Sequence, residues 1–147
     1  MTKAKLLAFL LCDRATRGSD GKVTVHDIFD RIVLPQIPVH YGDRKLFCVF
    51  YKVEALEPCV ISLRVVDRQG NEVPVQGGSR HDSIEQTGLM QSLWYLVTDM
   101  FQEVGDYRFE LRVEGEGNDV QPLATSILKI DLRKDLDSHE HSMHFYR

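Results

Sequence analysis

The sequence is poor in cysteine, has no excess of positive charge and contains no long apolar run. Its three cysteines, Cys12, Cys48 and Cys59, leave at least one thiol unpaired in any intramolecular scheme, and all three lie in apolar segments. They are therefore expected to be reduced core residues of a cytoplasmic protein. The formal net charge of −4 lacks the basic footprint that phosphate neutralisation requires, which argues against a nucleic-acid partner. No segment approaches the length of a membrane-spanning helix, which argues against a membrane partner.

The common signatures of catalysis are also missing. The sequence shows no nucleophile–base spacing, no paired carboxylates on a recognisable scaffold and no phosphate loop, since Gly77-Gly78 lacks a strand-glycine-helix context. The apolar run 6–12 follows Lys3 and Lys5 as in a secretion signal, but it is only seven residues long and has no small-x-small cleavage site. We expect this run to be a first strand, and we expect no cofactor.

What the sequence does contain is a strong strand signal between Gly105 and Gly115. Apolar and charged side chains alternate there, and successive side chains of a strand point to opposite faces of a sheet. The expected buried row is Tyr107, Phe109, Leu111 and Val113, and the expected solvent-facing row is Arg108, Glu110, Arg112 and Glu114. This pattern predicts an antiparallel sheet with one solvated face.

Turn signals divide the rest of the chain into similar segments. The predicted strands are 4–14, 22–34, 44–55, 59–68, 71–76, 91–101, 106–114 and 123–132, with Pro74 placing the fifth at an edge. Length and composition fit one globular domain. The predicted fold class is all-β, a single antiparallel β-sandwich of seven to eight strands, immunoglobulin-like or jelly-roll-like, over residues 1–133. Residues 134–147 are predicted to be a short polar tail that contains histidines.

Three predicted strands, 4–14, 44–55 and 91–101, are apolar on both faces. A two-sheet domain needs one apolar face per strand, so the surplus predicts cover either by the chain's own loops or by a partner subunit. The second alternative predicts a homo-oligomer, most simply a two-fold dimer. The face bearing Trp94, Leu96 and Met100 is the expected interface.

Two segments carry residues suited to chemistry. His139, His141 and His144 in the tail have the side chains of a zinc or nickel site, although a polar terminal segment lacks the ordered support that such sites need. Residues 77–91 predict a long surface loop with Arg80, His81 and Asp82 as candidates for binding. The charged residues of 27–31 are interpreted as an edge or a bulge in the second strand.

Several strings resemble a known family. They are Leu10-Leu11-Cys12-Asp13, Asp20-Gly21-Lys22-Val23-Thr24-Val25, Ile28-Phe29-Asp30-Arg31-Ile32 and Gly105-Asp106-Tyr107-Arg108-Phe109-Glu110-Leu111. Together they span about residues 6–132 and are similar to a family of small bacterial proteins known as a domain of unknown function. The resemblance implies a compact bacterial β-sandwich and carries over no catalytic residue.

The sequence thus favours a non-enzymatic intracellular binding or assembly module that acts through sheet faces or end loops and associates with itself. The alternative is a small metal-dependent or ligand-binding enzyme that uses loop 77–91 or the C-terminal histidines. A carbohydrate-binding domain with Trp94 or Tyr95 as a stacking platform ranks last, because aromatic residues make up only 9% of the chain.

Overall fold

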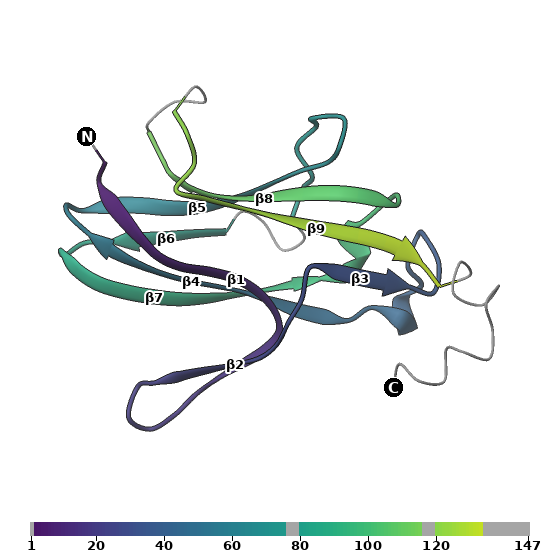
Figure 1. Ribbon diagram of the computed structural model, residues 1–147, viewed down its shortest axis with the longest axis horizontal. Coiled ribbons are helices and arrows are strands. Elements are labelled where there is room, and N and C mark those ends of the chain that lie inside the picture. Colours follow the sequence, from purple (N-terminus) through teal and green to yellow (C-terminus); the bar gives the residue numbers. More distant parts are fainter. Residues whose placement is uncertain (1, 76–79, 116–119, 134–147) are drawn as a thin grey trace.

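A computed structural model describes residues 2–75, 80–115 and 120–133 of the chain. Among these residues nine strands form two sheets (Figure 1), and no α-helix occurs. The strands are β1 (Ala4–Arg17), β2 (Val23–Ile28), β3 (Arg31–Leu34), β4 (Leu46–Ala55), β5 (Cys59–Val66), β6 (Arg80–Ile84), β7 (Gly88–Val97), β8 (Gly105–Val113) and β9 (Ala124–Leu132). Two 3-10 turns, η1 (Tyr41–Asp43) and η2 (Thr98–Met100), complete the list of elements. The all-β prediction is confirmed.

The two sheets differ in their number of strands and in the direction of strand pairing. Sheet A has the order β2-β1-β4-β7 and is antiparallel throughout, and sheet B has the order β3-β9-β8-β5-β6. In sheet B, β3 pairs in parallel with β9, from Arg31 opposite Lys129 to Leu34 opposite Leu132. The prediction of a purely antiparallel arrangement is therefore wrong at this pair. It failed because a four-residue strand reached by a chain crossing leaves no mark in the alternation pattern.

The core lies between the sheets and follows from the alternation in β8. Tyr107, Phe109, Leu111 and Val113 are all buried, as the sequence predicts. Phe109 meets the Phe47 ring of β4 edge-on, with the ring centres 6.2 Å apart, and Phe47 also stacks on Phe101 at 5.9 Å. These rings join the two sheets, because β8 belongs to sheet B and β4 to sheet A.

The segment predicted as one strand over 22–34 is two strands in different sheets. β2 ends at Ile28 in sheet A, and β3 begins at Arg31 in sheet B. Asp27 has a φ of 56°, a left-handed conformation that asparagine and aspartate tolerate better than most residues. The charged residues of 27–31 thus mark a crossing between sheets rather than a bulge within one strand. Phe29 stays with the core, with its ring centre 6.2 Å from that of Phe47.

The chain covers much of the surplus apolar surface of sheet A itself. Cys12 and Cys48 face one another across β1 and β4 and are fully buried, together with Ala15, in a small second cluster. The β1–β2 hairpin lies over β7, because the Tyr95 hydroxyl donates to the Ala15 carbonyl at 3.1 Å and the Gln91 amide donates to the Gly21 carbonyl at 3.1 Å. Part of the doubly apolar pattern is thus explained by this hairpin.

Two further predicted segments differ from the structure. The segment predicted as a strand over 71–76 makes only an isolated bridge, from Glu72 to Val66, within its described part. The strand predicted over 91–101 begins earlier, at Gly88, and passes into η2 at Thr98. The predicted tail, 134–147, lies outside the described residues. Within the described ranges no helix has the length and hydrophobicity needed to cross a membrane.

Candidate functional site

The segment predicted as a loop over 77–91 contains the edge strand β6, which distributes three of the predicted binding residues over two faces. Arg80 lies opposite Leu63 and Asp82 opposite Ile61, so both share the inward face of β5. His81 lies between them on the outer face, where its ring contacts the Glu114 carboxylate of the β8 end. The structure therefore keeps Arg80 and Asp82 together and separates His81 from them.

Asp82 accepts a hydrogen bond from a fully buried tyrosine of the opposite sheet. The Tyr51 hydroxyl donates to Asp82 Oδ2 at 2.6 Å, and the Tyr51 ring lies 4.9 Å from that of Trp94. Burial, and then the bond to Asp82, raise the pKa of Tyr51 far above its ordinary value. The phenol therefore stays protonated and acts as a donor that connects β4 to β6, not as a catalytic base.

We expect Tyr51→Phe to lower the free energy of unfolding by about 1–3 kcal/mol, because it leaves the partly buried Asp82 without its donor. Urea unfolding followed by circular dichroism measures this loss. Tyr95→Phe is the matched control: it removes a bond to the Ala15 carbonyl from a more exposed ring and should cost less. Equal losses in the two variants would contradict the assignment of Tyr51 as the stronger link.

The predicted interface residues, which lie in β7 and η2, are not on an outer face. Trp94, Leu96 and Met100 are only 7%, 1% and 6% exposed, so the prediction that they form a surface is wrong. The error is one register step, since both faces of this segment are apolar and alternation alone does not say which face turns inward. The outer side of β7 carries Leu89 and Tyr95, which are 71% and 42% exposed.

β7 is the outermost strand of sheet A, and one row of its backbone groups points away from that sheet. The amide of Thr98 donates to the Lys45 carbonyl, continuing the β4–β7 register, so even-numbered residues make the ladder bonds. The odd-numbered residues then direct their N–H and C=O groups to the free side. Consistent with this, the Tyr95 carbonyl accepts a hydrogen bond of 3.2 Å from Arg80 Nη2. We call the row formed by Leu89, Gln91, Leu93, Tyr95 and Val97 the β7 edge.

The β7 edge differs from the other sheet margins. Proteins commonly protect outer strands with charges, proline or short length, because an open strand invites pairing with another chain. β2 carries Asp27, β3 has four residues and includes Arg31, and β6 carries Arg80 and Asp82. β7 has ten residues, none of them charged and none of them proline. The run without charge from Gly88 to Val97 was visible in the sequence, but its edge position was not.

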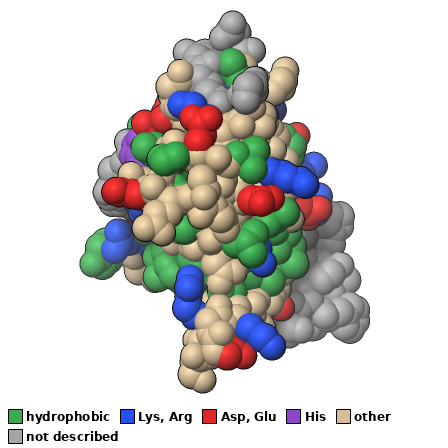
Figure 2. All heavy atoms as spheres, turned by 90° about the vertical axis from the view of Figure 1, so that its left-hand side faces the viewer, with side chains coloured by type: hydrophobic (Ala, Val, Ile, Leu, Met, Phe, Trp, Pro, Cys, Tyr) green, Lys and Arg blue, Asp and Glu red, His purple; other side chains and the backbone are tan. Residues whose placement is uncertain are grey.

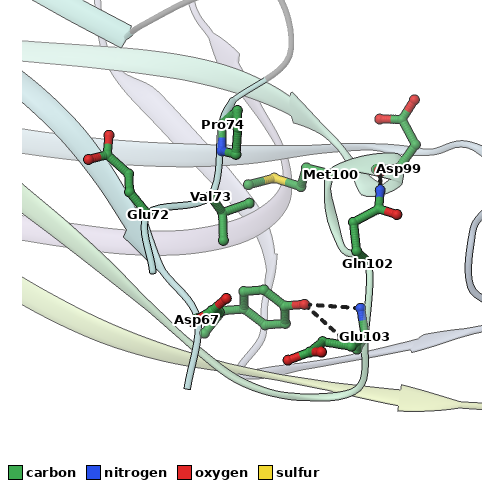
Figure 3. A pocket seen from close by; sticks show the side chains of 9 residues that line it. Asp67, Glu72, Val73, Pro74, Asp99, Met100, Gln102 and Glu103 are labelled. Carbon is green, nitrogen blue, oxygen red and sulfur yellow. Dashed lines mark hydrogen bonds between the residues drawn. The ribbon is translucent and has the colours of Figure 1, made fainter. Parts of the chain in front are cut away.

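A hollow of about 500 Å³ opens at one end of the molecule, between the β5–β6 connection and η2 (Figure 3). Met100 extends toward Val73 and Pro74 across it, and four carboxylates surround it: Asp67, Glu72, Asp99 and Glu103.

Most of these carboxylates already have partners. Asp67 accepts from two amides of its own turn, Glu72 pairs with Arg64, and Asp99 pairs with Arg44. The Tyr107 hydroxyl donates to the Glu103 carbonyl at 2.8 Å. Within the described ranges no group of three or more histidine, cysteine or acidic residues is placed to hold a metal ion. The carboxylates of Asp67, Glu72 and Asp99 therefore serve the fold. The candidate metal ligands His139, His141 and His144 lie outside the described residues.

The outer face of sheet B holds a buried carboxylate that the alternation pattern did not predict. Glu110 belongs to the expected solvent-facing row, yet it is only 4% exposed. Arg108 Nε donates to its Oε2 at 2.8 Å and Arg112 Nε donates to its Oε1 at 2.9 Å, while Arg64 lies at 3.7 Å on the next strand. The signal for this arrangement was a glutamate flanked by arginines at both i−2 and i+2 on one strand face.

The arginines around Glu110 change the pKa of its carboxyl group. Burial alone would raise its pKa, but the hydrogen bonds and positive charges of Arg112 and Arg108 outweigh burial and lower the pKa below its ordinary value of 4.5. Glu110 is thus held ionised by arginines that close over it.

The chain resembles several solved structures at low sequence identity. Similar solved structures include the C-terminal domain of wzt, with 14% identity, a TM-score of 0.49, and coverage of 88% of this chain and 74% of that chain. The Pseudomonas fluorescens alkylpurine DNA glycosylase AlkC has 10% identity and a TM-score of 0.47, over 88% of this chain and 30% of that chain. An immunoglobulin-like protein (PA1606) from Pseudomonas aeruginosa has 7% identity and a TM-score of 0.43, over 88% and 97% of the two chains.

A search of curated proteins finds no match. A family model of unknown function matches residues 7–125, most of the chain, and this confirms the resemblance to an uncharacterised family. The chain therefore belongs to DUF6941, a family of unknown function.

Proposed function

We propose that this protein is a non-enzymatic assembly module that binds a second copy of itself along the β7 edge. The observation that carries the proposal is the contrast among the outer strands: β7 alone among those described combines ten residues with no charge and no proline. Pairing of two β7 strands would join two copies of sheet A into one continuous sheet.

The absence of charge on β7 favours a second copy over an unrelated partner. In a two-fold antiparallel pair, residues near the axis face their own copies, so a charged residue there would oppose a like charge. Arg80 already donates a hydrogen bond to the Tyr95 carbonyl. The part of β7 that can pair with a second copy therefore lies nearer the start of the strand. We place the axis at Gln91, which sets each Gln91 opposite its copy and Leu89 opposite Leu93.

Apolar burial supports the same pairing. Leu89 is 71% exposed, and the Gly88 end of β7 lies on the side of the molecule that Figure 2 views, where hydrophobic side chains gather in patches between charged ones. Removing apolar area from water contributes about 25 cal/mol per Å², so covering Leu89 would add to the backbone hydrogen bonds that the edge gains.

The proposal also assigns the two-sheet fold to the immunoglobulin-like β-sandwich class, in a bacterial protein of the cytoplasm. Support for a reducing compartment comes from Cys12, Cys48 and Cys59, which are all buried core residues. The shared core between sheets A and B supports the sandwich class.

Light scattering tests the association. We expect the unmodified protein to show a dimer mass at micromolar concentration and a shift toward monomer on dilution over about a hundredfold range. Gln91→Lys and Gln91→Glu should each be monomeric, because each places like charges at the two-fold axis. An equimolar mixture of the two variants should recover the dimer mass, because opposite charges then face one another.

The mixing experiment and a charged variant on the other sheet serve as controls. Each variant removes the Gln91 amide that donates to the Gly21 carbonyl, and mixing the two variants does not restore that amide, so recovery of the dimer on mixing reports on the charges at the axis. Ile127→Lys on β9, which is exposed on the other sheet, should leave the dimer intact. A monomer mass for the unmodified protein at every concentration would overturn the proposal, and so would a dimer mass for Gln91→Lys alone.

A further inference from the structure

The arginine cluster on sheet B has a geometry that its structural role does not explain. Replacing buried ion pairs by apolar side chains is often neutral or stabilising, so a buried carboxylate is weak evidence for a contribution to stability. Glu110 also stands in a row that faces solvent by alternation, and it is buried because arginines on two strands enclose it. The arrangement therefore calls for a reason other than the core.

Glu110 holds the guanidinium groups of Arg108 and Arg112 by the same kind of hydrogen bond. It binds both Arg108 and Arg112 through Nε, which leaves the terminal nitrogens of each fork directed elsewhere. Arg112 Nη1 donates to the Val120 carbonyl at 3.1 Å, which fixes that group further. Among the described residues, none forms a hydrogen bond or ion pair with the terminal nitrogens of Arg108, which binds Glu110 through Nε. Two arginines held in place lose little additional side-chain freedom when they bind a ligand.

A hollow of about 320 Å³ lies against these two arginines. Its lining comes from β8, from β9 and from the connection between them: Arg108, Glu110, Arg112, Val120, Gln121, Pro122 and Thr125. Thr125 lies opposite Glu110 in the β8–β9 register. Arg64 also pairs with Glu72, so the charges beside the hollow are those of Arg108 and Arg112 against the single carboxylate of Glu110, an excess of one positive charge.

We propose that this hollow binds a small oxyanion, the phosphate or carboxylate group of a ligand, between Arg108 and Arg112. Planar guanidinium forks match the oxygen pairs of both groups, and charge-assisted hydrogen bonds of this kind are the strong ones. Thr125 and Gln121 line the same hollow with side chains that have donors to offer. The site lies on the outer face of sheet B and is independent of the β7 edge.

Titration of the full chain with sodium phosphate and, separately, with sodium acetate tests the site. The readout is the Nε–H resonances of arginine in ¹⁵N-labelled protein, in a buffer without other oxyanions. We expect saturable shifts confined to Arg108 and Arg112, the two arginines that line the hollow. Saturation with phosphate alone assigns a phosphate ligand, and saturation with both anions assigns the broader oxyanion class.

Two variants and one control complete the test. Arg108→Gln, which leaves Arg112 on Glu110, should weaken binding by about tenfold, and Arg108→Lys should weaken it less because it retains the charge. Arg17→Gln, at an exposed arginine of β1, should leave binding unchanged. The proposal is overturned if neither anion gives a saturable shift, if Arg108→Gln binds like the unmodified protein, or if Arg17→Gln weakens binding equally.

Discussion

The Phe109→Asp variant is expected not to fold. Phe109 has no exposed surface and packs against Phe47 of the opposite sheet, so a carboxylate at this position would be buried without a partner. Burying an unpaired charge costs several kcal/mol, which is comparable with the total stability of about 5–15 kcal/mol of an ordinary domain. Far-ultraviolet circular dichroism and thermal unfolding of the purified variant measure the loss.

Ile127→Asp provides the matched control for this variant. Ile127 lies on the neighbouring strand β9 and is 48% exposed, and it faces Arg108 across the β8–β9 ladder. The same chemical change there should cost little, because water and a nearby guanidinium accommodate the new carboxylate. A folded Phe109→Asp protein, or an unfolded Ile127→Asp protein, would show that the inward and outward faces of sheet B are assigned incorrectly.

Arg112→Ala is expected to produce the second-largest loss, about 3–5 kcal/mol. Arg112 is itself largely buried and supplies the Nε–H that bonds Glu110 Oε1. Its removal leaves a buried carboxylate undercompensated, and this penalty exceeds the value of the hydrogen bond alone. Urea unfolding at neutral pH measures it.

A second substitution separates that penalty from simple loss of packing. The double variant Arg112→Ala with Glu110→Gln should lose less stability than Arg112→Ala alone, since a neutral amide does not need the missing charge. An equal or larger loss in the double variant would mean that Arg112 contributes through its packing and not through Glu110.

The pH dependence of unfolding gives an independent readout of the same cluster. Because the folded-state pKa of Glu110 is lowered, its contribution is fully present above the ordinary value of 4.5 and is lost as the pH falls through the lower folded value. The Glu110→Gln variant lacks this titration, so its stability should fall less steeply below about pH 4.5 than that of the unmodified protein.

The buried face of a strand could be predicted from the sequence only where one face is apolar and the other is polar. In β8 one face is apolar and the other charged, so alternation predicted the buried Phe109 and Leu111 correctly. In β7 both faces are apolar, and no local property distinguishes Trp94, which is buried, from Tyr95, which is not. β6 escaped prediction because its sequence, Arg-His-Asp-Ser-Ile, is polar and becomes a strand only through pairing with β5.

The candidate sites were predictable to a smaller extent, since each depends on contacts between distant segments. Asp82 was chosen as a binding residue, but its hydrogen bond to Tyr51 joins positions 31 residues apart. The sequence analysis placed Glu110 among the solvent-facing residues. Alternation shows which face of the sheet a side chain points to, but it does not show that neighbouring arginines bury that side chain. Sequence periodicity therefore predicted which side chains share a sheet face better than it predicted the hydrogen bonds and ion pairs that those side chains form.

The position of β9 within sheet B has a consequence for how the protein is made. β9 is the last described strand to leave the ribosome, yet it lies between β3 and β8 rather than at a margin. During synthesis β3 therefore waits without its neighbour in the sheet until nearly one hundred further residues have been added, from Arg31 to Lys129. Over that interval the core surface that Leu128 and Ile130 later cover has no strand β9 to cover it, so we expect sheet B to close only after β9 has been synthesised.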